Sequence, residues 1–153
     1  MEEMGIIRRS NSPWASPIHL VPKKDGSFRP CGDFRRLNTV TKPDRYPIPY
    51  LSDATHFLEG KTVFSKVDLI RGYHQISVHP ADIPKTAVIT PFGLFESVKV
   101  PFGLKNDAQA FQRMMDRVGG DLDFVFIYLD DVLVASSSLD EHYQHLQELF
   151  DRL

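Results

Sequence analysis

The stretch Tyr128-Leu129-Asp130-Asp131 lies between two short apolar runs, residues 124–127 before it and residues 132–135 after it. Each run is rich in β-branched or aromatic residues and is bounded by polar ones, which predicts a buried strand. Strands this close along the chain can be joined only by a tight turn. The sequence therefore predicts an apolar hairpin whose tip carries two adjacent carboxylates, where a divalent cation can bind.

A third carboxylate, Asp68, ends another predicted strand over residues 63–67. Three carboxylates delivered by strand ends are what two-metal phosphoryl transfer requires. Two carboxylates about 5 Å apart repel each other by about 3 kcal/mol at an effective dielectric of about 20, so their convergence favours cation binding. Oxygen ligands of this kind suit Mg²⁺. Alternatively, Asp130-Asp131 is a polar turn and Asp68 a strand terminator, and these residues alone leave both interpretations open.

Composition limits the remaining possibilities. With 153 residues, 42% of them hydrophobic, the chain is long enough for one ordinary core. Cys31 is the single cysteine, which excludes an internal disulfide. The longest apolar run, residues 124–129, is far shorter than the roughly 20 residues of a membrane span, so no membrane partner is expected. No targeting signal is visible, and the sequence leaves the cellular location open.

Charge is distributed unevenly along the chain. Residues 1–48 contain nine Lys and Arg against five acidic residues, whereas residues 49–153 contain nine against fifteen. A basic front half suits contact with phosphates and an acidic back half suits cation binding. A chance imbalance on solvated surfaces is the alternative.

The first half of the chain predicts two hairpins and a helix. Residues 18–22 and 28–32 flank a cationic turn containing Asp25-Gly26, and residues 85–90 and 94–100 flank Pro91-Phe92-Gly93. Between these hairpins, Pro49 fits a first helical position and Gly60 a helix stop. The strand that ends at Asp68 is expected to lead into a turn through Arg71-Gly72-Tyr73.

Two amphipathic helices are predicted in the second half. The first begins near Asn106 or Asp107 and ends at Gly119-Gly120. The second follows Ser138-Leu139-Asp140-Glu141, which matches a capping box. Its buried positions are expected to be Leu146, Leu149, Phe150 and Leu153, with His142 and His145 at the surface. Because the helical pattern continues to the last residue, we expect the chain to be a fragment.

A series of motifs, in this order, links the chain to a known family. They are Ser16-Pro17-Ile18, Val21-Pro22-Lys23-Lys24-Asp25-Gly26, Arg29-Pro30-Cys31-Gly32-Asp33-Phe34-Arg35-Arg36-Leu37-Asn38, Asp44-Arg45-Tyr46-Pro47-Ile48-Pro49, Phe64-Ser65-Lys66-Val67-Asp68-Leu69, Gly72-Tyr73-His74-Gln75-Ile76, Pro101-Phe102-Gly103-Leu104-Lys105-Asn106, Phe111-Gln112 and Tyr128-Leu129-Asp130-Asp131. With these motifs the chain resembles the reverse transcriptase of gypsy-like LTR retrotransposons, a group related to retroviruses, from about Gly5 to Leu153.

The resemblance implies an α+β fold. A polymerase palm, an antiparallel sheet with helices on one face, would comprise residues 43–75 and 107–153. A fingers region rich in β-hairpins would comprise residues 1–42 and 76–106, interleaved with the palm in one reverse transcriptase domain fragment. The family's thumb is not expected in this chain.

The resemblance also implies a catalytic and metal-binding set. Asp68, Asp130 and Asp131 match the catalytic triad, with Asp68 and Asp130 as the main ligands of two Mg²⁺ ions, for which Mn²⁺ can substitute. Asp131 would be a lesser ligand, and the backbone carbonyl of Leu69 would join the metal shell.

Further residues match the family's substrate contacts. Lys23 and Arg29 match residues that grip the triphosphate, Tyr73 matches the aromatic steric gate beneath the incoming sugar, and Phe102 and Gly103 match the start of the segment lining the nucleotide pocket. Contacts with template or primer are expected from Arg35, Lys105, Gln112 and Tyr128. Arg35 is equally compatible with a structural ion pair.

The function implied is RNA-directed DNA polymerase activity, in which a primer 3′-hydroxyl attacks a dNTP on an RNA or DNA template. The remaining segments of a Pol polyprotein (thumb, RNase H and integrase) are expected partners if the reading frame is longer. The alternative is a truncated, inactive transposon remnant that at most binds nucleic acid. An RNA polymerase or nucleotide cyclase with a related palm fits less well, because Tyr73 occupies the gate position.

Asp107 departs from the family pattern, in which this position usually carries a small residue such as Ala or Ser. A carboxylate here could repel the template backbone, or it could cap the helix that begins at this point. The sequence leaves these two interpretations open.

Overall fold

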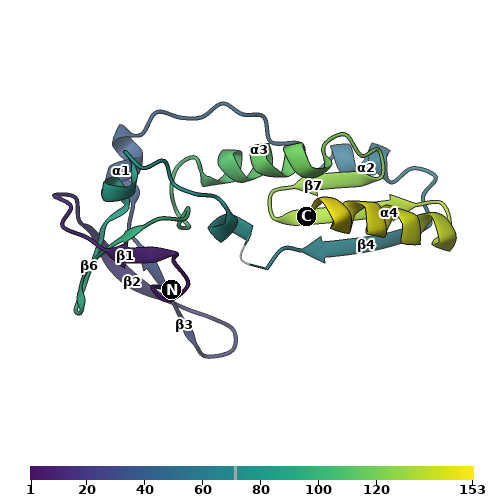
Figure 1. The fold of residues 1–153 in the computed structure, drawn as a ribbon. Coiled ribbons are helices and arrows are strands. Elements are labelled where there is room, and N and C mark those ends of the chain that lie inside the picture. Colours follow the sequence, from purple (N-terminus) through teal and green to yellow (C-terminus); the bar gives the residue numbers. More distant parts are fainter. Residues whose placement is uncertain (71) are drawn as a thin grey trace. The chain divides into compact units, whose positions relative to one another are not determined.

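The structure, a computed structural model, describes residues 1–70 and 72–153. It divides into two compact units: unit 1 comprises Met1–Pro43 and Tyr73–Asp107, and unit 2 comprises Asp44–Gly72 and Ala108–Leu153. Both units combine helices with strands, which confirms the predicted α+β class (Figure 1). Arg71, part of the turn predicted after Asp68, lies outside the described residues.

Unit 1 is built on a five-stranded sheet with the order β1-β6-β5-β2-β3. Its strands are β1 (Ile7–Arg9), β2 (Ser16–Pro22), β3 (Phe28–Gly32), β5 (Val88–Thr90) and β6 (Gly93–Ser97). The β2–β3 and β5–β6 hairpins are antiparallel, as predicted, and a parallel pairing of β2 with β5 joins them. β5 is shorter than predicted because a 3₁₀ turn, η2 (Ile83–Thr86), occupies the preceding residues. The sequence analysis did not predict β1.

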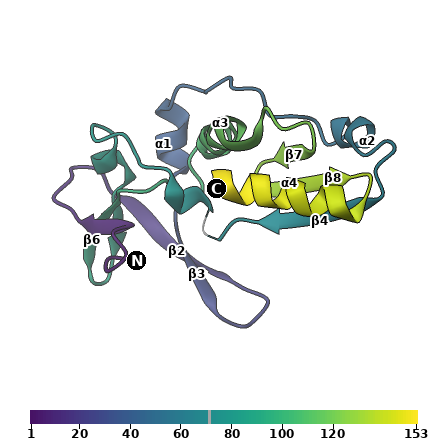
Figure 2. The same cartoon turned by 45° about the vertical axis from the view of Figure 1, so that its right-hand side comes forward.

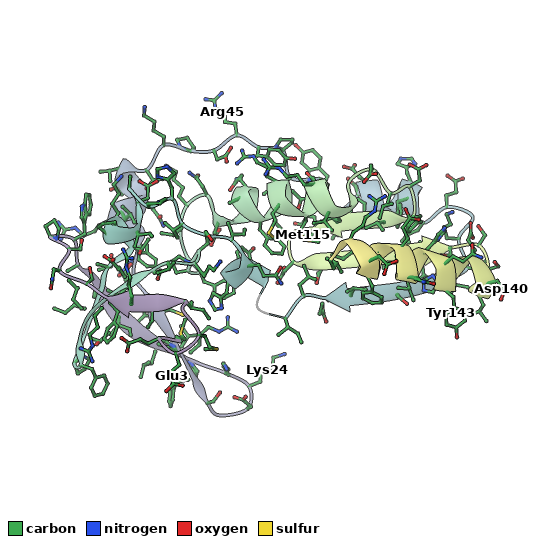
Figure 3. All side chains as sticks on the ribbon, in the orientation of Figure 1. Glu3, Lys24, Arg45, Met115, Asp140 and Tyr143 are labelled. Atoms are coloured by element: carbon green, nitrogen blue, oxygen red, sulfur yellow. The ribbon has the colours of Figure 1, made fainter. Side chains whose placement is uncertain are left out.

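The β2–β3 turn has the geometry that its Asp-Gly pair predicts. The Lys23 N–H donates to the Ser27 carbonyl at 2.7 Å, and Gly26 adopts a φ of 80°, a left-handed conformation that favours glycine. The Asp25 carboxylate accepts hydrogen bonds from the N–H and hydroxyl of Ser27 at 2.9 and 2.6 Å. Figure 3 shows the Lys24 side chain extending away from this turn into solvent.

In the core of unit 1, the Phe34 and Val88 side chains lie very close to Gly32. The Phe34 side chain is 2% exposed and packs so tightly that a Cβ atom on Gly32 would lie 2.7 Å from its ring and 2.8 Å from Val88. Only glycine therefore fits at the end of β3. Phe34 directly precedes α1 (Arg35–Val40). A further 3₁₀ turn, η1 (Gly72–Gln75), carries Tyr73.

Unit 2 contains a three-stranded antiparallel sheet with the order β4-β8-β7. Its elements are α2 (Asp53–Phe57), β4 (Val63–Asp68), α3 (Asp107–Gly119), β7 (Val125–Tyr128), β8 (Asp131–Ser136) and α4 (Leu139–Arg152). The three strands and the two longer helices were predicted. α2 is shorter than predicted and begins at Asp53 instead of Pro49.

One face of the unit 2 sheet is buried beneath two helices. In β8, Val132, Val134 and Ser136 alternate along this face and are fully buried. α4 contacts β4 and β8 and runs along them in both views (Figures 1 and 2). α3 covers the same face, since a Cβ atom on its Gly119 would lie 3.4 Å from Ile127, the cross-strand partner of Val132. The prediction of helices on one face is confirmed for the two longer helices, whereas Phe57 of α2 packs against Phe126 on the opposite face, with 5.7 Å between ring centroids.

The α4 helix begins as predicted but buries a different face. The Ser138 hydroxyl accepts a hydrogen bond from the Glu141 N–H, which confirms the cap. Leu149 is fully buried, whereas Phe150 and Leu153 are 55% and 48% exposed, so their predicted burial was wrong. Figure 3 shows Tyr143 extending away from the helix.

The prediction that His142 and His145 lie at the surface was also wrong. His142 is 5% exposed and contacts Ser65 through Nε2 and Ser136 through Nδ1, both at 2.8 Å. The His145 ring stacks on Phe124 with 3.8 Å between centroids, and its Nδ1 lies 2.8 Å from the same Ser136 hydroxyl. Because the sheet offers hydroxyl groups beneath α4, the imidazoles can be buried with hydrogen-bond partners.

Candidate active site

The acidic stretch forms the turn of the β7–β8 hairpin, as predicted. Tyr128 pairs with Asp131 across the two strands, which leaves Leu129 and Asp130 as the two turn residues. Leu129 has a φ of 55°, and it is the single non-glycine residue with positive φ in the described part of the chain. This conformation costs about 1–2 kcal/mol for an L-residue, so the surrounding structure must compensate.

Gln112 in α3 supplies that compensation. Its side chain is fully buried, its Oε1 accepts a hydrogen bond from the Leu129 N–H at 3.0 Å, and its Nε2 donates to the Ile127 carbonyl at 3.2 Å. The same Nε2 lies 3.0 Å from Asp116 Oδ1. Gln112 thus binds the backbone on both sides of Tyr128. Its burial does not fit the template or primer contact predicted for it, and a role in positioning the turn is the better interpretation.

The Gln112 contact extends into a network within unit 2. The Tyr46 hydroxyl donates to Asp116 Oδ2 at 2.7 Å, and this hydrogen bond raises the pKa of Tyr46. Arg113 contacts Asp44 through a forked pair of hydrogen bonds at 2.8 and 2.7 Å and lies over the Tyr46 ring, 4.6 Å from its centroid. The segment that begins at Asp44 is thereby attached to α3.

Asp68 and Asp131 lie together on the sheet face opposite α3 and α4, which is called the open face below. They are direct cross-strand partners at the ends of β4 and β8, so both side chains project from the face opposite α3 and α4. Lys66 lies two residues before Asp68 and shares this face. Its Nζ atom is 2.8 Å from Asp131 Oδ1 and 3.4 Å from Asp68 Oδ1. Hydrogen bonds to Asp131 and then to Asp68 raise the pKa of Lys66.

The donor set suits a hard cation. Asp68 and Asp131 already share one positive charge, the Lys66 ammonium, and exposed Asp130 adjoins them in the turn. Mg²⁺ is commonly held by one or two carboxylates together with substrate phosphates and water. The side chains therefore fit such an ion, although within residues 1–70 and 72–153 no three His, Cys, Asp or Glu side chains are gathered closely enough to form a complete metal site. Leu69, whose carbonyl is the predicted additional ligand, directly follows β4.

All five predicted nucleotide-binding residues belong to unit 1, and three of them form a stack. The Tyr73 and Phe102 rings lie 4.8 Å apart, and the Arg29 guanidinium lies 5.5 Å from the Phe102 centroid. Cation–π attraction stabilises such an arrangement. Lys23 lies at the start of the β2–β3 turn, and Gly103 follows Phe102 with a φ of 93°. The structure thus brings Arg29, Tyr73 and Phe102 together.

Two of the predicted template contacts have structural partners. Arg35 forms a forked ion pair with Asp33 at 2.8 and 2.6 Å, and its hydrogen bonds lower the pKa of Asp33 to about 2. Lys105 Nζ donates to the Asn38 and Thr41 carbonyls at 3.3 and 2.9 Å, which satisfies the end of α1. Tyr128 is half-buried in β7. Arg35 is 88% exposed, so its ion pair leaves the guanidinium accessible.

Asp107 stabilises the backbone of its own unit. Its Oδ2 accepts a hydrogen bond from the Gly103 N–H at 3.0 Å, four residues earlier. The carboxylate thus fixes a glycine in a left-handed conformation at the start of α3. This contact stabilises the segment before α3 and does not decide between the two interpretations left open by the sequence.

Comparison with known proteins identifies the family. Residues 21–153 match the family described as reverse transcriptase (RNA-dependent DNA polymerase). The chain is 44% identical over 150 residues to a retrovirus-related Pol polyprotein from transposon opus of Drosophila melanogaster. It is 41% identical over 160 residues to the one from transposon 297 of the same organism, and 36% identical over 151 residues to the transposon Tf2-3 polyprotein of Schizosaccharomyces pombe.

These matches cover 94%, 100% and 97% of this chain but 15%, 15% and 11% of the three polyproteins. Among solved structures, native prototype foamy virus protease-reverse transcriptase superimposes with a TM-score of 0.84 at 24% identity, covering 97% of this chain and 20% of that one. The foamy viral enzyme in complex with an RNA/DNA hybrid gives 0.86 at 20% identity, covering 99% and 20%. At these identities the structural likeness establishes the fold.

The architecture is therefore the α+β palm-and-fingers fold of a polymerase. The chain belongs to the reverse transcriptase (RNA-dependent DNA polymerase) family, as its motifs indicated. It corresponds to a segment of retrotransposon Pol polyproteins.

The sequence analysis missed the roles of two residues next to the acidic turn, Lys66 and Gln112. Lys66 could have been found from the alternation of β4, which places residues 64, 66 and 68 on one face. The support of the turn by Gln112 had no comparable signal, because it depends on how α3 meets β7.

Proposed function

We propose that this chain is the catalytic part of an RNA-directed DNA polymerase, which transfers a nucleotide from a dNTP to a primer 3′-hydroxyl on an RNA or DNA template. Membership of the family supports this proposal. The observation that carries it is the convergence of Asp68 and Asp131 on the open face of the sheet, with Asp130 in the adjoining turn. We propose that unit 1 is the fingers region and unit 2 the palm.

Asp68, Asp130 and Asp131, with the Leu69 carbonyl, are the proposed ligands for divalent cations, Mg²⁺ or Mn²⁺. A bound pair of such ions would favour ionisation of the primer hydroxyl and stabilise the leaving pyrophosphate. The carboxylates, held at the ends of β4 and β8, orient the reacting groups on the open sheet face. The Gln112 contacts keep the Asp130-Asp131 turn in one conformation, which matters because misplacement by about 1 Å can cost about 100-fold in rate.

The unit 1 residues are proposed to bind the nucleotide. Lys23 and Arg29 would contact the triphosphate, for which a point cation and a planar guanidinium are complementary donors. Tyr73 would lie beneath the sugar and exclude a 2′-hydroxyl, and Phe102 and Gly103 would line the pocket. The contact of Arg29 with Phe102, and of Phe102 with Tyr73, supports a single preorganised group.

Nucleic acid contacts belong to the same proposal. We propose Arg35, Lys105 and Tyr128 as contacts to template or primer, mainly through phosphate and sugar, because base pairing with the template supplies the specificity. Because the relatives are polyproteins, further Pol segments are proposed partners.

The test is incorporation of dNTPs on an oligo(dT)-primed RNA template in the presence of Mg²⁺ or Mn²⁺. The control is the Asp130→Asn/Asp131→Asn double variant, matched by Asp123→Asn/Asp151→Asn, which removes two exposed carboxylates of unit 2 away from the turn. We expect incorporation by the wild-type chain and the matched variant, and none by the first variant. Absence of incorporation from all three would contradict the proposal and favour an inactive remnant.

A further inference from the structure

Lys66 occupies an unusual position for a surface lysine. On β4 the even-numbered residues are exposed and the odd-numbered ones half-buried, so Lys66 and Asp68 project side by side from the open face. Across the strands, Asp131 is the direct partner of Asp68. The Lys66 ammonium consequently contacts two of the proposed metal ligands, at 2.8 Å from Asp131 and 3.4 Å from Asp68.

The contribution of this arrangement to folding stability is small. The three side chains are 56%, 77% and 52% exposed for Lys66, Asp68 and Asp131, and ion pairs in such solvated positions contribute little. The effect of Lys66 on the repulsion between the two carboxylates matters more than its effect on stability. Two carboxylates at neighbouring positions repel each other unless a cation neutralises them, and here the chain itself provides that cation.

We propose that Lys66 is a resident counter-ion of the candidate active site: its ammonium holds Asp68 and Asp131 together before a divalent cation binds, and it competes with that cation for the same oxygens. The identity of the cation rests on the proposed polymerase function. The counter-ion role itself rests on the geometry of Lys66.

The competition has a direct consequence for metal affinity. A divalent ion that binds Asp68 and Asp131 must displace the ammonium or bind within a few ångströms of it, and both cost free energy. Lys66 therefore weakens binding of the ion by itself. An ion that arrives with a negatively charged triphosphate is less affected, because the phosphates offset the positive charge. The site then favours metal bound together with nucleotide over metal alone.

The test is titration of the 153-residue chain with Mn²⁺ alone, followed by the EPR signal of free Mn²⁺. Lys66→Met keeps a long apolar stem and removes the charge, whereas Lys66→Arg keeps the charge. Lys61→Met is the matched control, since it removes one positive charge five residues earlier, about 16 Å away along an extended chain. We expect Lys66→Met to bind Mn²⁺ about tenfold more tightly than wild type, whereas the other two variants stay within about twofold.

A second measurement separates this role from a structural one. In EDTA, Lys66→Met should have a lower thermal midpoint than Lys61→Met, because the carboxylates are left facing each other, and saturating Mn²⁺ should remove the difference. A Lys66→Met affinity equal to or weaker than that of wild type, or no Mn²⁺ binding by any chain, overturns the proposal.

Failure of the proposed function has a different signature. Tighter Mn²⁺ binding by Lys66→Met in a chain whose wild type incorporates no dNTP would leave the counter-ion role standing and reject the polymerase activity. Incorporation by the wild type together with unchanged Mn²⁺ affinity in Lys66→Met would support the polymerase activity and reject the counter-ion role.

Discussion

The Gln112 side chain accepts a hydrogen bond from the Leu129 N–H at 3.0 Å, and Leu129 is the residue in the acidic turn with a φ of 55°. A fully buried amide in α3 is therefore bonded to the strained residue that precedes the two aspartates. This contact stabilises the turn by satisfying a backbone donor where the strand ladder cannot. The conformation of the Asp130-Asp131 pair consequently depends on a side chain that is distant in the sequence.

Gln112→Met should destabilise the chain by about 2–3 kcal/mol, because it keeps the side-chain volume but leaves the Leu129 N–H and the Ile127 carbonyl without partners. Urea unfolding followed by circular dichroism measures this loss. Gln112→Glu is the informative control, since it retains an acceptor for Leu129 but places a second carboxylate beside Asp116. A Gln112→Met chain as stable as wild type would contradict the role assigned to Gln112.

The sequence was sufficient for the elements that follow local rules. The period-2 pattern of β4, the tight turn after Tyr128 and the Ser138 cap all depend on residues within a few positions of one another. Asp68 and Asp131 could also be nominated, because each lies at a strand end. Their pairing across the strands could not be predicted, because the register between β4 and β8 is set by contacts between residues more than sixty positions apart.

Side-chain partners across elements were beyond the same reasoning. The apolar pattern of α4 suggested burial of Phe150, but the helix instead presents His142 to the sheet, where Ser65 and Ser136 provide hydrogen bonds. Helical periodicity specifies which residues share a face, not which face a neighbouring sheet can satisfy. Lys66 illustrates the same limit, since one of the two carboxylates that it contacts, Asp131, lies on another strand.

Unit 1 should lose stability in acid through Glu96. Its side chain, 8% exposed, accepts hydrogen bonds from the Ser10 hydroxyl at 2.6 Å and from Arg8 Nε at 2.7 Å, and these donors hold the pKa of Glu96 below its ordinary value of 4.5. Because the folded pKa is the lower one, the stabilisation is complete above 4.5 and is lost as the pH falls through the folded pKa.

The measurement is urea unfolding at pH 7 and at about pH 3.5, followed by the fluorescence of Trp14, the chain's single tryptophan and a residue of unit 1. Glu96→Gln should be less stable than wild type by roughly 1 kcal/mol at pH 7, and the difference should shrink in acid. A difference that is the same at both pH values would exclude Glu96 as a source of acid sensitivity.

Asp107 should contribute to stability through its hydrogen bond and not through its charge. Asp107→Ala removes the acceptor of the Gly103 N–H and should cost about 1 kcal/mol, whereas Asp107→Asn keeps a carbonyl oxygen and should cost less than half as much. Trp14 fluorescence during urea unfolding reports both variants. Equal losses for the two would indicate that the negative charge at the start of α3 matters more than the hydrogen bond.

Tyr73 should determine the choice between deoxyribonucleotides and ribonucleotides. Its ring packs on Phe102 with 4.8 Å between centroids and is 9% exposed, so its position is fixed by packing and it can act as a rigid barrier. Tyr73→Val shortens the side chain and should raise the use of rGTP relative to dGTP by at least about tenfold, since steric exclusion in a pocket is worth about that much.

Tyr73→Phe retains the ring on Phe102 and should discriminate as the wild type does. Primer extension with each nucleotide alone measures the ratio of kcat/KM values. If Tyr73→Val and Tyr73→Phe gave the same ratio, the ring would be a core residue of unit 1 and the 2′-hydroxyl would be excluded by another group.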